Sequence, residues 1–206
     1  MIKALACGFL LLAGAALAED APPPVSDEFV RLFSSYCLNK FPDDDALLKQ
    51  AEADKLEPLS PAQVRTMLHK DTGIGWVVAG ARLQYVLTVE QPPFHTCALR
   101  HASDHMLDGQ PLIAAAKSFV EVSGHKLLPP VGHARPMSQG MISNSLILQE
   151  LDEKDQPLPQ AYMYFVVSYP SVPREDGSMS KPFHKSALYG SSTASRLEAV
   201  PSKAAP

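Results

Sequence analysis

The sequence predicts an α+β fold, in which an antiparallel sheet of about six strands carries helices on one face. Three patterns support this prediction. Apolar residues recur every three or four positions from Phe29 to Cys37, alternate with polar residues from Leu83 to Glu90, and run almost without interruption from Ala161 to Tyr169. The first pattern is typical of an amphipathic helix, the second of a half-buried strand and the third of a central strand.

The chain begins with the pattern of a secretory signal peptide, residues 1–18. Lys3 supplies a short positive region, an apolar segment follows as far as Ala15, and Ala16-Leu17-Ala18 fits an A-x-A cleavage site. The apolar segment is shorter than the ~20 residues that a membrane-spanning helix needs. We therefore expect cleavage after Ala18, a periplasmic or secreted location, and no membrane span in the mature chain.

Charge and cysteine content narrow the possible partners. The formal net charge is −4 at pH 7, and loss of Lys3 on export leaves the mature chain one unit more negative. This mild acidity gives no basic footprint and argues against nucleic acid as a partner. Export also removes Cys7, so that only Cys37 and Cys97 remain. In an oxidising compartment such a pair is more simply a disulfide than a catalytic thiol.

Residues 19–26 are predicted to be a flexible lead-in, and residues 27–190 a single domain. The first helix starts at Asp27 and ends before Pro42, because proline disfavours helical geometry in the residue before it. A second helix covers residues 43–53, and the acidic run 43–45 at its start is interpreted as a solvated first turn rather than a calcium loop. A third helix begins at Ser60, which forms a capping box with Gln63.

The strands follow this helical segment. We expect strands at residues 76–79, 83–90 and 94–101, then a helix from Pro111 to Gly124. Residues 125–140 are predicted to be an irregular crossing loop, and residues 142–151 and 160–169 a hairpin. The end of the chain, residues 191–206, has the composition of a disordered tail.

A short sequence occurs twice. Residues 182–188 (PFHKSAL) match residues 93–99 (PFHTCAL) at five of seven positions. The order helix, strand, strand and PFH strand also repeats, which raises a fold of two αβββ halves as one description of the domain. In that case Ser186 stands where Cys97 stands. A chance match between two short segments is the alternative.

The histidines are the candidates for chemistry. His101 and His105 have a spacing that would suit a metal on a helix, but the glutamate that follows the first histidine in zinc-protease helices is missing. We expect these two residues to be solvated loop histidines, and we predict neither a metal site nor a cofactor. His95 stands two residues from Cys97, but the expected disulfide removes the thiol that a Cys-His nucleophile needs. No G-x-S-x-G elbow is present. The candidate binding residues are His95, Arg100 and His101.

Several of these features together resemble a family of small exported bacterial proteins of unknown function. They are the signal peptide, Cys37 followed by Phe41-Pro42-Asp43, the pair Gly75-Trp76, and the run from Pro92 to Cys97. The resemblance covers about the first half of the mature chain. It implies an exported protein with a Cys37–Cys97 link, and it implies no activity.

The sequence therefore predicts an exported, non-enzymatic binding or envelope-interaction protein, whose partner would be another envelope protein. The alternative is an envelope hydrolase or metal-dependent enzyme that uses the histidines near Cys97. An enzyme should have a concave pocket in which several polar groups converge. A binding module should instead have an exposed apolar patch or an open sheet edge.

Overall fold

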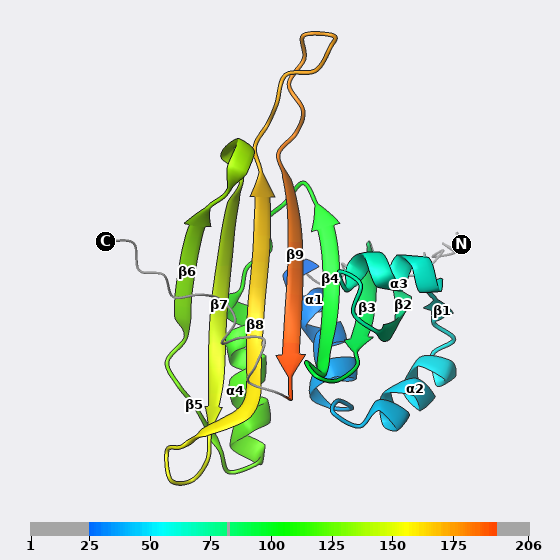
Figure 1. Ribbon diagram of the computed structural model, residues 1–206. Coiled ribbons are helices and arrows are strands. Elements are labelled where there is room, and N and C mark those ends of the chain that lie inside the picture. Colours follow the sequence, from blue (N-terminus) through cyan, green and yellow to red (C-terminus); the bar gives the residue numbers. More distant parts are fainter. Residues whose placement is uncertain (1–24, 82, 193–206) are drawn as a thin grey trace, which may run out of the picture.

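A computed structural model describes residues 25–81 and 83–192. These residues form one antiparallel sheet of nine strands together with four α-helices, which confirms the α+β class with more strands than the six expected. Helices α1 (Val25–Phe33) and α4 (Gln110–Val122) lie on the same side of the sheet, and no helix crosses the other side of strands β6 to β9 (Figure 1). The predicted signal peptide and residues 193–206 of the predicted tail lie outside the described residues, whereas Ser191 of that tail ends the last strand of the sheet.

The N-terminal helix forms where the apolar spacing predicts it. α1 starts at Val25, two residues earlier than expected, so residues 25 and 26 belong to the helix rather than to the lead-in. It continues into a π-helical segment η1 (Ser34–Leu38), which carries Cys37. Phe29, Phe33 and Cys37 all lie on the buried side. The three- and four-residue spacing therefore identifies the face that packs on the sheet.

Two short helices lie beside the end of the sheet that holds β1 (Glu57–Pro58). α2 (Asp44–Ala53) is capped by Asp43, whose side chain accepts a hydrogen bond from the amide of Ala46. α3 (Pro61–Met67) has both bonds of the predicted capping box between Ser60 and Gln63. Each cap satisfies amide groups that have no partner within the helix, which fixes where the helix begins.

Three consecutive strands make one half of the sheet. They are β2 (Gly73–Ala79), β3 (Gln84–Glu90) and β4 (Thr96–Ser103). β4 starts two residues later than predicted, because Phe94 and His95 belong to the turn after Pro92-Pro93. Tyr85, Leu87 and Val89 are fully buried, as the alternation from residue 83 predicts, but Thr88 and Glu90 on the other face are buried as well, so that only the first part of β3 is half-buried.

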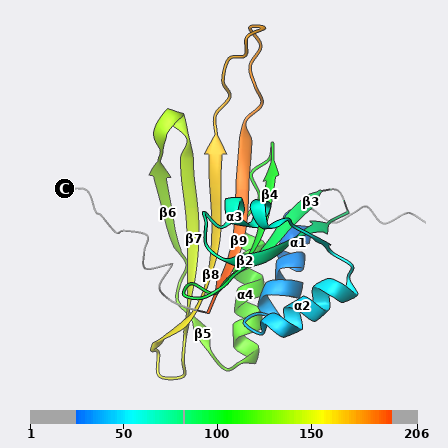
Figure 2. The same ribbon diagram turned by 45° about the vertical axis from the view of Figure 1, so that its right-hand side comes forward.

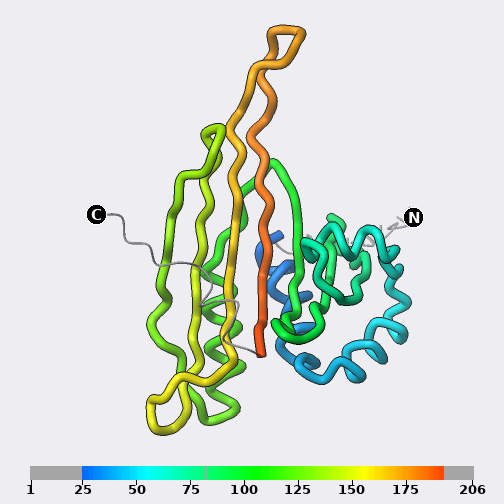
Figure 3. The backbone as a smooth tube through the Cα atoms, in the orientation of Figure 1, coloured from blue at the N-terminus to red at the C-terminus, as the bar shows by residue number. Residues whose placement is uncertain are grey.

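The other half follows α4. It contains β5 (Lys126–Leu127), β6 (Val131–Pro136), the short η2 (Ser138–Gly140), β7 (Ile142–Leu151), β8 (Pro157–Tyr169) and β9 (Phe183–Ser191). The prediction of an irregular loop over residues 125–140 is wrong. β6 has no apolar alternation because all six of its residues are exposed, and it forms by pairing with the backbone of β7. The connection between β8 and β9 projects beyond the rest of the sheet (Figures 2 and 3).

The strands are ordered β1-β2-β3-β4-β9-β8-β7-β5, with β6 also paired to β7. The two meanders, β2-β3-β4 and β7-β8-β9, therefore meet where β4 pairs with β9. Leu99 and Leu188, equivalent positions of the repeated PFH sequence, lie directly opposite each other in this pair. The register extends this pair into a row of six apolar residues across the sheet, namely Trp76, Leu87, Leu99, Leu188, Tyr164 and Leu146.

This topology has the pseudo-twofold arrangement expected of two αβββ halves. The third strands of the two halves pair with each other, and one helix from each half packs on the same side of the sheet. Ser186 stands 89 residues after Cys97, as Leu188 does after Leu99, and both Ser186 and Cys97 are buried. Only the first half carries the disulfide. The halves also differ at their edges, where α2, β1 and α3 flank one and β5 and β6 the other.

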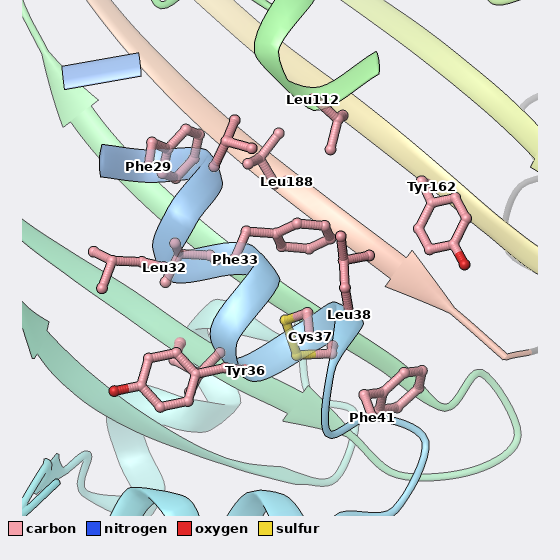
Figure 4. Packing of buried hydrophobic residues seen from close by; sticks show 14 of the residues in the cluster. Phe29, Leu32, Phe33, Tyr36, Cys37, Leu38, Phe41, Leu112, Tyr162 and Leu188 are labelled. Atoms are coloured by element: carbon pink, nitrogen blue, oxygen red, sulfur yellow. A yellow bond between two sulfur atoms is a disulfide. The ribbon is translucent and has the colours of Figure 1, made fainter. Parts of the chain in front are cut away.

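The core lies between the sheet and the two helices (Figure 4). Phe29 and Phe33 of α1 and Leu112 of α4 are almost fully buried against Leu99 and Leu188 of the central strands. The predicted disulfide joins Cys37 of η1 to Cys97 of β4, with Cα atoms 5.5 Å apart. Helix and sheet are thus linked both by apolar contact and by a covalent bond.

A buried carboxylate adds a polar link between the same two layers. Glu28 of α1 is 2% exposed; its Oε2 accepts a hydrogen bond from the Tyr85 hydroxyl at 2.9 Å and its Oε1 accepts one from the amide of Ala81 at 2.6 Å. Burial, and secondly the bond to Glu28, raise the pKa of Tyr85, so that the hydroxyl stays protonated and donates. Both carboxylate oxygens have partners, which reduces the cost of burying the charge.

We expect Cys97→Ser to lower the free energy of unfolding by about 4 kcal/mol, because the disulfide closes a loop of 60 residues and so restricts the unfolded chain. Urea unfolding of protein made in an oxidising compartment measures the effect, and Cys37→Ser should match it. Mass spectrometry after alkylation without reductant provides the control. Two modified thiols in the wild-type protein would contradict the link.

Gly80→Ala should lower the free energy of unfolding by about 1–3 kcal/mol, the usual cost of overpacking. A Cβ at this position would lie 2.6 Å from both Glu28 Oε2 and Tyr85 Cε2, which are held by their mutual hydrogen bond. Gly132→Ala is the matched control, since the nearest atom there is at 3.9 Å. Equal unfolding midpoints for the two variants would contradict this prediction, because Glu28 and Tyr85 would then move aside without a loss of stability.

Candidate functional site

The described residues line an open pocket of about 230 Å³ at the end of the sheet where β8 begins and β9 ends. Its walls come from η1 and the turn after it, from the C-terminal end of α4, and from the ends of β7, β8 and β9. Apolar side chains and polar side chains both line it. The lining residues are Cys37, Leu38, Phe41, Pro42, Phe119, Ser123, His125, Glu150, Gln160, Tyr162, Gly190, Ser191 and Ser192.

A bulge in β7 accompanies the position of Glu150. The register between β7 and β8 shifts between Gln149 and Leu151, and the Gln149 side chain donates hydrogen bonds to the carbonyl groups of Leu158 and Gln160 across the irregularity. Bulges commonly redirect a side chain relative to the regular strand. Here the residue within the bulge lines the pocket with its carboxylate.

The first polar group of the pocket consists of His125, Glu150 and Tyr162. His125 Nδ1 lies 2.5 Å from Glu150 Oε1, and the Tyr162 hydroxyl donates to Glu150 Oε2 at 3.0 Å. Glu150 is only 5% exposed. Burial, and secondly the nearby Glu150, raise the pKa of Tyr162, which keeps its proton on the hydroxyl. Because His125 is fixed through Nδ1, its other ring nitrogen remains for contact with a ligand.

The second polar group consists of Asp44, His95 and Ser192. Ser192 Oγ lies 2.8 Å from His95 Nδ1, and Asp44 Oδ1 lies 3.1 Å from His95 Nε2. The Gln91 side chain donates to the other oxygen of Asp44 at 3.1 Å, and the ring of Phe41 contacts the His95 ring at a centroid distance of 4.6 Å. Phe41 and Ser192 line the pocket, so this group borders it.

The pocket and its two polar groups suit two roles, ligand binding and nucleophilic catalysis. An apolar wall with a few fixed polar groups can hold a small ligand or a single side chain. A hydroxyl that is hydrogen-bonded to an imidazole, itself oriented by a carboxylate, is the signature of an activated nucleophile. In serine proteases the hydroxyl contacts Nε2 of the histidine and the carboxylate contacts Nδ1. In His95 the two nitrogens are exchanged, because Nδ1 contacts the Ser192 hydroxyl and Nε2 contacts the Asp44 carboxylate. Ser192 Oγ also lies 3.4 Å from the carbonyl oxygen of His95, a second acceptor for its proton.

The three sequence-predicted binding residues do not form one site. His95 borders the pocket, whereas Arg100 lies on the side of β4 that faces away from α1, and it donates to the Thr88 hydroxyl. His101 points to the helix side, against Phe29 and Tyr85, and is 6% exposed. The prediction of a solvated loop histidine at 101 is therefore wrong. The strand extends to Ser103, which carries the alternation through His101 and places this side chain in the core.

Sequence reasoning missed most of the pocket. Asp44 was assigned to a solvated helix start, although its side chain bonds His95 and Gln91. Ser192 lies 97 residues from its histidine partner, and no local spacing links them. His125 and Glu150 approach only because β5 pairs with β7, in a segment predicted to be a loop.

His101 and His105 do not share a helical face. His101 belongs to β4, and His105 follows that strand in a connection where its side chain is 84% exposed. Among the residues that the structure describes, no group of three or more His, Cys, Asp or Glu side chains is arranged to hold a metal ion. Within the same residues, no helix has the length and apolar character to cross a membrane.

Comparison with known proteins gives no further assignment: no family model, curated protein or solved structure matches the chain.

The buried imidazole of His101 should make stability depend on pH. Its Nε2 has no hydrogen-bond partner among the described residues, and burial lowers its pKa below the usual value of 6.5, against the opposing effects of the Gln84 carbonyl and of Glu28. As the pH falls through 6.5, the unfolded chain therefore takes up a proton that the folded protein does not. The free energy of unfolding then decreases, by at most about 1.4 kcal/mol per pH unit.

His101→Leu should remove this part of the pH dependence, which urea unfolding between pH 8 and pH 5 measures. His105→Leu is the control, because that side chain is largely exposed. Parallel stability profiles for the wild type and His101→Leu would contradict the buried position of the ring.

Proposed function

We propose that the protein is an exported binding protein and that its pocket receives a small ligand, or one side chain of a partner. The observation that carries the proposal is the convergence of the His125–Glu150–Tyr162 group on a pocket with apolar walls. Sites of this composition fix a ligand by burying its apolar part and pairing its polar part.

The size of the pocket limits the ligand. Pockets for drug-sized molecules measure roughly 300–1,000 Å³, and this one measures about 230 Å³. Phe41 and Phe119 offer ring contact, while His125, Ser123 and Gln160 offer hydrogen bonds. The ligand we propose therefore has the dimensions of a single aromatic or branched side chain, with one polar end.

Export is part of the proposal. The Cys37–Cys97 disulfide supports it, because such bonds persist mainly in oxidising compartments. The pattern of residues 1–18 and the resemblance to small exported bacterial proteins point the same way. An envelope location would give the protein access to other envelope proteins and to small molecules from outside the cell.

N-acetyltyrosinamide and benzoate are suitable probes of the pocket. In ¹⁵N-labelled protein, we expect one of them to shift the amide signals of Ser123, Tyr162 and Ser191 at millimolar concentration. Ser123→Trp should abolish these shifts by filling the pocket mouth, and Ser138→Trp is the matched control on an exposed residue at the other end of β7. If neither probe shifts these signals, or if the shifts persist in Ser123→Trp, the pocket proposal fails.

A hydrolase is the second candidate, favoured specifically by the Asp44–His95–Ser192 arrangement. A fluorophosphonate probe tests it. If Ser192 is activated, its Oγ bonds to phosphorus, fluoride leaves, and the hydroxyl proton passes to His95. Peptide mapping should then find the label on Ser192, dependent on His95 and unaffected by Ser191→Ala. An unlabelled Ser192 after prolonged exposure excludes the hydrolase and leaves the binding role.

A further inference from the structure

The side of the sheet that faces away from α1 and α4 differs from the rest of the molecule in its side chains, which include cations and aromatic rings but no carboxylates along the described strands β4 and β6 to β9. We use the name open face for the outward positions of β4, β6, β7, β8 and β9, which alternate with the core positions along each strand. Among the described residues, no helix crosses this side of β6 to β9 in Figure 1, whereas α3 packs on it over β2. The register places the outward residues in rows, one of which runs through His133, Ser145, Phe165, Ala187 and Arg100.

The open face is positively charged although the protein is acidic. Arg100, Arg135 and Lys185 all occupy outward positions, and His133 lies beside them. No Asp or Glu occupies an outward position of these five strands, all of which lie in the described part of the chain. The formal net charge of the whole chain is −4. The separation of charge between this face and the rest of the molecule is therefore a property of the fold.

Large side chains cover the surface between the charges. Met163, Phe165 and Tyr189 occupy outward positions and stay partly exposed. The Arg100 guanidinium lies 5.4 Å from the centroid of the Tyr189 ring, and the Lys185 amine lies 5.3 Å from that of Tyr169. These contacts hold the cations flat against the sheet. The face is thus preorganised, and binding it costs little side-chain entropy.

We infer that the open face docks an acidic surface of a second protein. Tyr, Phe, Met and Arg are the residues enriched in protein–protein interfaces, and they are the large residues of this face. Its cations favour a negatively charged partner, which also steers the encounter. β6 favours a polypeptide as the partner. All six of its residues are exposed, and β7 is its only described pairing partner, so its other edge lies open. Its outer backbone groups can pair with an added strand.

Apart from Ser191 at the end of β9, this surface shares no residue with the lining of the pocket, which opens between η1, α4 and the strand ends. The inference therefore goes beyond the proposed ligand site, and each can fail without the other. An exported protein with both would hold its partner by one side of the sheet and its small ligand at the sheet end.

A random copolymer of glutamate and tyrosine serves as the acidic polypeptide probe. Biolayer interferometry at 50 mM salt should detect its binding to the oxidised wild-type protein, and affinity should fall with added salt. Arg100→Glu/Arg135→Glu/Lys185→Glu should weaken binding at least tenfold. The matched control is Lys49→Glu/Lys117→Glu/Lys154→Glu, which changes the net charge equally on exposed residues elsewhere and should stay within threefold.

Arg100 also contacts Thr88, so substitution of Arg100 could disturb folding. The double variant Arg135→Glu/Lys185→Glu leaves Arg100 in place, and its unfolding midpoint should be unchanged. It should weaken binding at least threefold. Absence of wild-type binding, or equal loss in the control variant, overturns the inference. Phosphatidylglycerol vesicles and single-stranded DNA, each added at the same charge concentration as the polypeptide, are tested as competitors for its binding. Displacement of the polypeptide by either would assign the face to a lipid surface or to nucleic acid instead.

Discussion

The attachment of the N-terminal helix to the central strand β4 is the contact on which the rest of the structure depends. The Cys37–Cys97 bond fixes η1 against β4, and Glu28 makes a second link from α1 to β3 through Tyr85. Between these links, Phe29 and Phe33 bury their rings against the sheet. The position of η1 determines one wall of the pocket, because Leu38 and Phe41 follow Cys37 within four residues. A structural bond and one wall of the candidate functional site are therefore built from the same short stretch of chain, residues 37–42.

The pseudo-twofold sheet explains why the two sides differ. Both halves contribute their helix to the same side, so that side holds the core, and no helix of the described residues covers the other side of β6 to β9. Strands in this arrangement need apolar residues only at alternate positions. The outward positions were therefore free to carry cations and aromatic rings. The backbone of the sheet is thus nearly symmetric, but the candidate sites are not. The pocket lies at one end of the sheet, and the charged surface lies on one of its sides.

Sequence patterns predicted the elements that repeat locally and missed the contacts that depend on pairing. The helix from Phe29 to Cys37, the capping box at Ser60 and the strand around Leu87 were predictable because each has a period or a cap of its own. β6 was not, since an exposed edge strand needs no apolar alternation. The disulfide was predicted from the cysteine count and from the expectation that the chain is exported. By contrast, the distance between His95 and Ser192 depends on β4 pairing with β9, which no local signal encodes.

The central claim, that strands β7 to β9 face the core on one side and an accessible surface on the other, is tested most directly by hydroxyl-radical footprinting of the folded, oxidised full-length chain. Side chains that alternate along one strand provide internal controls: Met163 and Phe165 face outward on β8, whereas Tyr162 and Tyr164 face the helices. The account predicts rapid oxidation at Met163 and Phe165 and slow oxidation at Tyr162 and Tyr164. Equal protection of both sets would contradict it, because the outward side chains would then be covered in solution.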